Sequence, residues 1–226
     1  MPQTEVRPPK TQILQGISAK ALRVDRGGRA IVRGVDFEMR AGEALLVLGR
    51  NGAGKSTLLR ALAGFLSLRE GEVRLNGGAA EATLAEQAHY VGHADGLKAA
   101  LTALDNLEFW ARMLKGAAGA GLSPEGALEK VGLARVGDFP VAYLSAGQKR
   151  RVALARLFVA PRPIWLLDEP ATALDVGSQA KFAEAMAAHR AGGGFILAAT
   201  HAPLGLVDAK ELRLDAVRPR EAGDAA

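Results

Sequence analysis

The stretch GRNGAGKS, Gly49 to Ser56, decides how this chain folds. It fits the pattern G-x-x-x-x-G-K-[ST], in which glycines let backbone N–H groups turn inward around an anion and a helix N-terminus follows. The apolar run Ala44–Leu48 leads into it and suits a buried parallel strand, and a helix is expected from about Lys55 to Gly64. These flanks favour a phosphate-binding loop over an ordinary glycine-rich turn.

Two side chains of this loop have a direct role in the phosphate-binding interpretation. Lys55 reaches the β- and γ-phosphates of a nucleotide, and the hydroxyl of Ser56 is offered to Mg²⁺. We therefore predict a combined nucleotide and magnesium site. The predicted nucleotide-binding residues are Gly49, Arg50, Asn51, Gly52, Ala53, Gly54, Lys55, Ser56 and Thr57.

A second apolar run ends in two adjacent carboxylates. Ile164–Leu167 reads as a buried strand, and Asp168 and Glu169 follow it directly, before Pro170. Successive strand residues point to opposite sides, so Asp168 is predicted to serve the Mg²⁺ shell while Glu169 faces the attacking water. Two adjacent carboxylates after an apolar run often only mark the point where the chain passes from the core to the solvent. The position of this pair about 110 residues after the phosphate loop favours the catalytic interpretation.

Strands alternate with helices along most of the chain, which indicates an α/β layered fold with a mainly parallel sheet. A helical stretch from about Leu101 to Leu157 interrupts this alternation, with Thr102 as a plausible N-cap. The further predicted elements are short strands at Ala21–Val24, Val35–Arg40, Glu72–Leu75, Phe195–Ala199 and Glu211–Leu214, and a helix over Gly177–Arg190.

The motif Leu144-Ser145-Ala146-Gly147-Gln148 opens a helix. Ser145 is a good N-cap, and the helix that it opens presents free N–H groups to an anion. In the alternative interpretation, this is a capped amphipathic helix that binds no ligand. The motif resembles the signature of ABC ATPases, normally Leu-Ser-Gly-Gly-Gln, with Ala146 where that family usually has Gly. Thr172-Ala173-Leu174-Asp175 resembles the family's D-loop, and Thr200-His201 lies where its switch histidine lies.

This resemblance covers about residues 17 to 217. It implies a P-loop NTPase of the ABC type, with a mainly parallel sheet, an antiparallel β subdomain and an inserted helical subdomain at about 97–157. Residues 1–16 are expected to be a flexible arm and 218–226 a polar tail.

The resemblance also implies a mechanism. ATP and Mg²⁺ are the cofactors, and Lys55, Glu169 and His201 are the catalytic residues. A second copy of the chain closes its signature, with Ser145, Gly147 and Gln148, over the γ-phosphate.

Besides Ala146, two further positions depart from the family pattern. In Tyr90-Val91-Gly92-His93, His93 occupies the place of the usual Q-loop glutamine, and Gln87 is out of register. A neutral histidine can hydrogen-bond to metal-bound water, so His93 joins Ser56 and Asp168 in the predicted metal set. The family stacks adenine on an aromatic residue near the first strand, and here Arg26 is the candidate in its place.

A narrower resemblance rests on Tyr90–His93, Gly96-Leu97-Lys98, Leu101–Leu107 and Ser145–Gln148. These stretches resemble the corresponding sequences in the ATPase subunits of cytochrome c maturation haem exporters. That family implies a peripheral complex on the cytoplasmic face of the bacterial inner membrane, with multispanning membrane subunits. It also implies that hydrolysis releases a haem-loaded chaperone. The alternatives are the ATPase of another exporter, or a soluble ABC ATPase that acts on ribosomes or DNA.

Composition bounds these hypotheses. The 226 residues suit one large domain, no apolar run of about 18 residues spans a bilayer, and the N-terminus does not read as a secretory signal. The chain has no Cys and four His, so direct haem binding is not expected. Its net charge is +5, but the cations are scattered and the densest cluster is only Lys149–Arg151. We interpret them as a solvated surface, not as a nucleic-acid site.

Apolar residues in the helical stretch have two interpretations. They could form a groove that receives a helix of the membrane partner, or they could be core, as apolar helical spacing usually indicates. The residues concerned are Leu97, Leu101, Leu104, Leu107 and Trp110.

Overall fold

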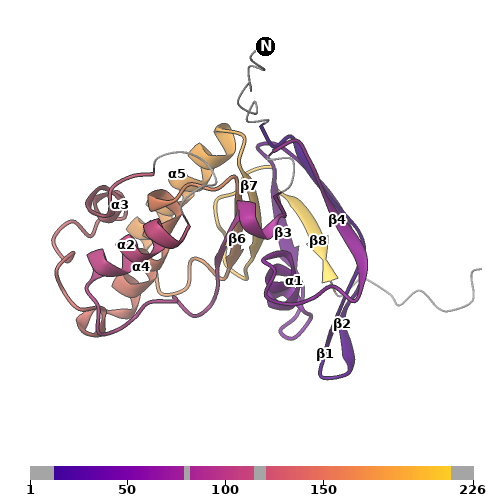
Figure 1. Cartoon of the computed structure of the whole chain (residues 1–226), viewed down its shortest axis with the longest axis horizontal. Helices are drawn as coiled ribbons and strands as arrows, with labels where there is room; N and C mark the ends of the chain where they lie inside the picture. Colours follow the sequence, from indigo (N-terminus) through magenta and orange to yellow (C-terminus); the bar gives the residue numbers. More distant parts are fainter. Residues whose placement is uncertain (1–12, 79–81, 115–120, 215–226) are drawn as a thin grey trace, which may run out of the picture.

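The computed structural model describes residues 13–78, 82–114 and 121–214. An antiparallel sheet and a parallel sheet face each other across helix α1 (Lys55–Leu62). The helical part, formed by the helices between residues 103 and 159, lies on the other side of the parallel sheet (Figure 1). The predicted α/β class is confirmed. Most of the proposed arm and all of the proposed tail lie outside the described residues, but Leu14, near the end of that arm, is buried.

Each sheet has a simple order. The antiparallel sheet runs β2-β1-β4, and the parallel sheet runs β5-β6-β7-β3-β8 with each neighbouring pair parallel. The strands are β1 (Gly16–Arg26), β2 (Arg29–Arg40), β3 (Ala44–Leu48), β4 (Glu70–Asn76), β5 (Ala88–Val91), β6 (Ile164–Asp168), β7 (Phe195–Ala199) and β8 (Lys210–Arg213).

The helices divide between the sheet faces and the helical part. α1 (Lys55–Leu62) and α5 (Val176–Ala191) cover the parallel sheet. The others are the 3₁₀ turns η1 (Ala85–Gln87) and η2 (Val141–Tyr143), and the helices α2 (Ala103–Met113), α3 (Pro124–Lys130) and α4 (Ala146–Val159).

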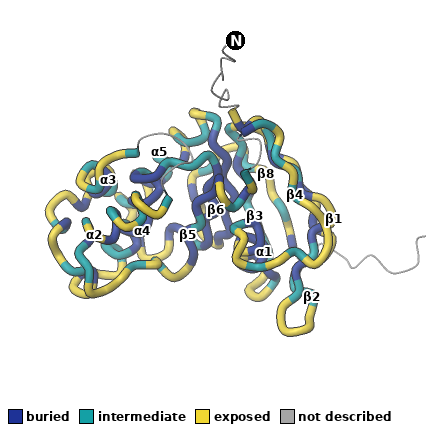
Figure 2. Tube along the Cα trace, viewed as in Figure 1, coloured by how far each residue is buried: buried dark blue, intermediate teal, exposed yellow. Residues whose placement is uncertain are grey.

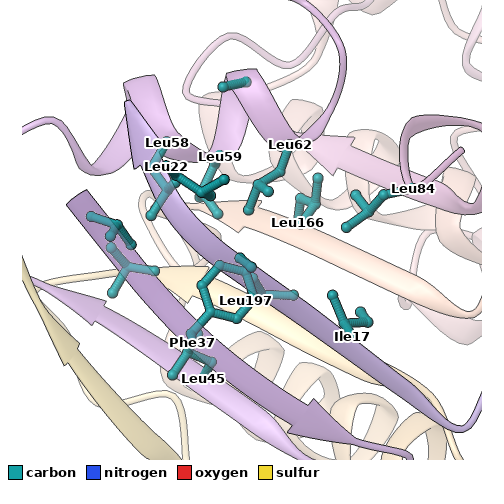
Figure 3. Packing of buried hydrophobic residues seen from close by; sticks show 14 of the residues in the cluster. Ile17, Leu22, Phe37, Leu45, Leu58, Leu59, Leu62, Leu84, Leu166 and Leu197 are labelled. Atoms are coloured by element: carbon teal, nitrogen blue, oxygen red, sulfur yellow. The ribbon is translucent and has the colours of Figure 1, made fainter. Parts of the chain in front are cut away.

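The core lies on both faces of the parallel sheet. On one face, α1 packs Leu58 and Leu59 between Leu166 of the parallel sheet and Leu22 of the antiparallel sheet (Figure 3). On the other face, Trp165 packs among residues of α4 and α5. All five residues of β6 are buried, and Figure 2 shows this strand in dark blue. A strand buried on both sides explains why its sequence is a continuous apolar run.

Several element boundaries differ from the sequence prediction. The first two strands were expected at 21–24 and 35–40 but extend over 16–26 and 29–40. Pairing between them continues through polar residues, with register shifts that a bulge at Ala21 (φ 51°) accommodates. The helix after the phosphate loop ends at Leu62 instead of Gly64, because Gly64 has φ 79°.

The helical part is built on capped helices and a third apolar cluster. Thr102 caps α2 as predicted, and its hydroxyl accepts from the N–H of Asp105 at 3.0 Å. Leu107 is fully buried in this cluster, and Leu97, Leu104 and Trp110 pack against it. Leu107 is therefore core and cannot line a docking groove.

The cationic cluster at 149–151 is not uniformly solvated. Arg150 is 3% exposed, which makes the surface interpretation wrong for this residue. Eight of the fourteen residues of α4 are buried, so the helix has no clear division into an apolar and a polar face.

Candidate functional site

The phosphate loop joins the carboxyl end of β3 to α1. Its glycines adopt backbone conformations that other residues avoid, with φ 148° at Gly49, 84° at Gly52 and 100° at Gly54. A Cβ at Gly54 would also lie 3.1 Å from Ile31 and 3.2 Å from Val32. Gly54 is the N-cap of α1 and makes no side-chain cap. The first N–H groups of the helix are therefore not capped by a side chain and suit an anion.

Lys55 is held by three acceptors. Its Nζ lies 2.7 Å from the carbonyl oxygen of Gly49, 3.2 Å from that of Arg50 and 3.2 Å from Nε2 of His201. An ammonium group has three N–H donors, so these contacts match its capacity. The residue is 8% exposed. The Lys55 ammonium is thus held between the carbonyl oxygens of the phosphate loop and His201, which follows β7.

A chain of hydroxyls fixes Asp168 at the end of β6. Ser56 donates to Asp168 Oδ1 at 3.0 Å, and Tyr90 donates to Asp168 Oδ2 at 3.2 Å. Arg60, one turn after Ser56 on α1, donates to the Tyr90 oxygen at 3.3 Å. Burial is the largest cause of the raised pKa of Tyr90, which keeps its proton available for donation. Both oxygens of Asp168 are therefore oriented by neighbours.

Glu169 and His201 lie on the ends of adjacent strands. The N–H of Glu169 donates to the Ala199 carbonyl at 2.8 Å, and the residue then turns into the left-handed region with φ 49°. Its Oε1 lies 3.7 Å from Nε2 of His201. A non-glycine residue at positive φ is costly and occurs preferentially at functional sites. The carboxylates of Glu169 and Asp168 accordingly have different partners: Glu169 lies near His201, and Asp168 accepts from Ser56 and Tyr90.

One open cleft of about 590 Å³ collects most of the predicted residues. It is lined by Asn51, Gly52, Gly54, Lys55, Ser56, Thr57, His93, Asp168, Glu169 and His201. Gly49, Arg50 and Ala53 belong to the same loop but are not in this lining. Arg26 and Ile31 also border the cleft, and among the described residues of the lining there is no Phe, Tyr or Trp. His93 thus shares the cleft with the predicted metal residues.

The predicted signature lies elsewhere. Ser145 caps α4 as predicted, with its hydroxyl accepting from Gln148 N at 3.2 Å and Gln148 Oε1 accepting from Ser145 N at 2.8 Å. A Cβ at Gly147 would lie 2.7 Å from the Ala173 carbonyl, so this position requires glycine. Ser145 is exposed, and none of the three predicted signature residues lines the cleft.

Arg150 is a buried residue that the sequence interpretation missed. Its guanidinium donates to the carbonyls of Gly92, Asp168, Glu169 and Pro170 at 2.7–3.2 Å, and it pairs with Asp95 at 3.1 Å. It therefore connects the signature helix to the end of β6 and to the loop that carries His93. No local signal distinguishes Arg150, because Lys149, Arg151 and Arg156 are further cations on the same helix.

Comparison with known proteins places these features in a family. The ABC transporter family model matches residues 32–172. The cytochrome c biogenesis ATP-binding export protein CcmA of Nitrobacter winogradskyi is 54% identical over 88% of this chain and 97% of its own length. The protein of the same name from Bradyrhizobium diazoefficiens is 53% identical, over 85% of this chain and 94% of its own.

Solved structures agree with this assignment. A dimeric ATP-binding cassette in a post-hydrolysis state, bound to ADP and Pi, aligns with a TM-score of 0.70 at 25% identity, covering 82% of this chain and 88% of that one. A bacterial Atm1-family ABC exporter with ATP bound aligns with a TM-score of 0.74 at 25% identity, covering 94% of this chain and 39% of that one. The resemblance drawn from the sequence is confirmed: the chain is an ABC ATPase and belongs to the family of cytochrome c biogenesis ATP-binding export proteins.

Proposed function

We propose that this chain is the ATP-hydrolysing subunit of the haem exporter of cytochrome c maturation, and that its turnover releases a haem-loaded chaperone. The observation that carries the catalytic part is the single cleft that Lys55, Ser56, Asp168, Glu169 and His201 share. The identity of about 50% to relatives named for cytochrome c biogenesis supports the pathway. The division into an ABC domain at 17–217 with a helical subdomain at about 97–157 is part of this proposal.

Ser56 at the start of α1 and Asp168 at the end of β6 fit Mg²⁺. The Ser56 hydroxyl and an Asp168 oxygen lie 3.0 Å apart, and both are hard oxygen donors of the kind that this ion prefers. Among the described residues there is no group of three or more His, Cys, Asp and Glu that could hold a metal. Such a sparse set suits an ion that binds through one or two protein oxygens and substrate phosphates. Bound there, Mg²⁺ would neutralise charge that develops on the phosphates.

The protein side chains supply the remaining steps. Lys55 would exchange its contacts to Gly49, Arg50 and His201 for oxygens of the β- and γ-phosphates. Glu169 would orient the attacking water and accept its proton, and His201 would contact the γ-phosphate from the end of β7. His93 borders the same cleft and would hydrogen-bond to water on the metal. Arg26 is the candidate to stack on adenine, with Ile31 beside it in the lining.

A second copy would complete the site. Ser145, Gly147 and Gln148 lie outside the cleft of their own subunit, which supports a role for the signature end of α4 in the site of another copy. The ADP-bound relative named above is dimeric. We infer an ATP sandwich in which two copies close over two nucleotides and open after hydrolysis. The closed state is favoured because ATP contacts both copies only there.

The membrane part of the proposal requires partner subunits. No helix within 13–78, 82–114 and 121–214 has the length and apolar character to cross a bilayer. We propose that the protein binds peripherally to multispanning subunits at the cytoplasmic face of the inner membrane. Haem and nucleic acid are not proposed as ligands. An ATPase for a different exporter is the alternative, and the Atm1-family exporter at 25% identity is a weaker precedent than the relatives above 50%.

The first experiment replaces Glu169 by Gln. The amide keeps the shape of the side chain but cannot accept a proton, so ATP should still bind while hydrolysis falls about a hundredfold or more. Gel filtration with Mg²⁺ and ATP should then show a trapped dimer. Wild-type turnover in this variant would leave Glu169 as a structural residue only.

The second experiment tests the pathway. Deleting the gene should abolish haem attachment to c-type cytochromes and spare b-type haem proteins, as haem staining of periplasmic extracts would show. The wild-type gene should restore staining and Glu169→Gln should not. Normal c-type cytochromes in the deletion strain would refute the pathway but leave the ATPase assignment intact.

A further inference from the structure

A second cleft lies between the end of α3, one side of α4 and one side of α5. We call it the α4–α5 cleft, and its cavity volume is about 370 Å³. It shares no residue with the lining of the nucleotide cleft. Its volume is at the lower end of the range for small-molecule sites and suits a ligand much smaller than ATP with its metal.

The floor of the α4–α5 cleft is apolar and aromatic. Leu154 and Phe158 lie at i and i+4 on α4, and Phe182 faces them from α5. Leu154 and Phe182 are buried and Phe158 is half-buried. A floor of this kind accepts the hydrocarbon or aromatic part of a ligand.

The rim carries three cations from three different elements. They are Lys130 at the end of α3, Arg151 on α4 and Lys181 on α5. The Lys130 ammonium lies 5.4 Å from the centre of the Phe158 ring, so charge and apolar floor are adjacent. Within the described part of the chain, none of the three forms an ion pair with a carboxylate.

The carboxylates around the cleft do not balance this charge. Glu184 is the acidic residue in the lining. Asp175 interacts electrostatically with Arg151 and Lys181, but its Oδ1 accepts from Ser178 N at 2.7 Å and caps α5. That backbone hydrogen bond is the largest cause of its lowered pKa. An excess of positive charge therefore remains over an apolar floor.

We propose that the α4–α5 cleft binds a small amphipathic anion, a carboxylate or phosphate group on an apolar body. The apolar body contacts Leu154, Phe158 and Phe182, and the anionic group interacts with Lys130, Arg151 and Lys181. The ligand is a free small molecule, because the cleft volume of about 370 Å³ between three converging elements suits a body of limited size. Nothing in this site depends on ATP hydrolysis.

Trp165 supplies a built-in reporter. It is 3% exposed and contacts both aromatic residues of the floor, with ring centres 6.1 Å from Phe158 and 6.5 Å from Phe182. The chain has two tryptophans, so Trp110→Phe leaves Trp165 as the single indole. A ligand that shifts Phe158 or Phe182 should change its fluorescence.

The experiment titrates the full-length Trp110→Phe protein with decanoate below its micelle concentration. We expect a saturable change in Trp165 fluorescence and a higher melting temperature, since a ligand that binds only the folded state stabilises it. Decyltrimethylammonium has the same tail with the opposite charge and should bind at least tenfold more weakly. Inorganic phosphate, which has no tail, should also be at least tenfold weaker. Equal binding of the cationic and anionic amphiphiles would overturn the proposal.

Three variants locate the site. Lys181→Glu should weaken decanoate binding at least tenfold by reversing a rim charge, and Ala185→Phe should do so by filling the cleft from α5. Lys20→Glu, an exposed charge reversal on β1, is the matched control and should leave affinity unchanged. Unchanged affinity in folded Lys181→Glu and Ala185→Phe proteins would place the ligand elsewhere. A response to phosphatidylglycerol vesicles but not to decanoate would assign the surface to a membrane and also overturn the proposal.

Discussion

The two helix N-termini that the sequence predicts to contact phosphate, at the start of α1 and of α4, have different surroundings. At the phosphate loop, the N-terminus of α1 is surrounded by Lys55, Asp168, Glu169 and His201 in one cleft. At the signature, the N-terminus of α4 carries an exposed Ser145 and lies outside that cleft. One helix N-terminus is built into a site, and the other is presented outward. The contrast supports the proposal that a single copy holds most of the predicted catalytic groups and needs a second copy to complete the site.

The largest expected effect comes from the loop end. Lys55→Ala removes the charge that the loop holds against Gly49 and Arg50, so turnover should fall about a thousandfold. A coupled ATPase assay and a thermal melt would separate catalysis from folding. Turnover close to that of the wild type would contradict the comparison, because the phosphate loop would then not be needed for catalysis.

The signature end should behave differently. Ser145→Arg places a bulky cation at the exposed start of α4, so hydrolysis should fall on the order of a hundredfold because the two copies cannot close. ATP binding to the single subunit should stay within about twofold, measured with a fluorescent nucleotide. Loss of nucleotide affinity in the monomer would show that the signature contributes to its own site, contrary to the comparison.

The connection between the two ends depends on Arg150. Arg150→Gln leaves several buried carbonyls and Asp95 without their partner, so the free energy of unfolding should fall by about 3 kcal/mol. Urea denaturation measures this. Lys149→Gln on the same turn, where the lysine reaches one carbonyl at 3.3 Å, is the control and should cost less than about 1 kcal/mol. Equal losses in the two variants would argue against a specific link.

The smallest effect is expected at Tyr90. Tyr90→Phe keeps the ring against Phe65, 5.5 Å between centres, but removes the hydrogen bond to Asp168, so apparent Mg²⁺ affinity should weaken by about fivefold, or about 1 kcal/mol. Paramagnetic resonance of Mn²⁺ titrated with ATP and protein reports this without turnover. Tyr143→Phe, at an 81% exposed tyrosine, is the matched control. If metal affinity is the same in both variants, Tyr90 does not orient Asp168.

The interior strands and the local motifs were predictable from sequence. Ala44–Leu48 and Phe195–Ala199 have the predicted bounds, because a strand buried on both faces is a continuous apolar run that ends where the run ends. The caps at Thr102 and Ser145 were predictable because each acts on residues within the next turn. The hairpin of β1 and β2 was underestimated, because its length depends on pairing between strands and its edges are polar.

The candidate site divides in the same way. The positions of Lys55, Ser56, Asp168 and Glu169 were predictable, because each belongs to a short motif whose residue types and spacing are those that phosphate and metal binding require. Arg150 and Tyr90 were missed because their partners lie 18 to 78 residues away and are carbonyls or a carboxylate reached only after folding. A backbone carbonyl carries no sequence signal for the side chain that will bind it.

The sequence by itself determined the phosphate loop, the carboxylate pair, the helix caps and the family, because each rests on contiguous residues whose chemistry requires those types in that order. Only the tertiary structure decided that Tyr90 contacts Asp168, that Arg150 is buried between two motifs, and that Ser145 lies outside the cleft. These facts depend on which strands are neighbours and on which face of α4 is enclosed. Parallel strands brought together by long connections set that arrangement, and no local pattern records it.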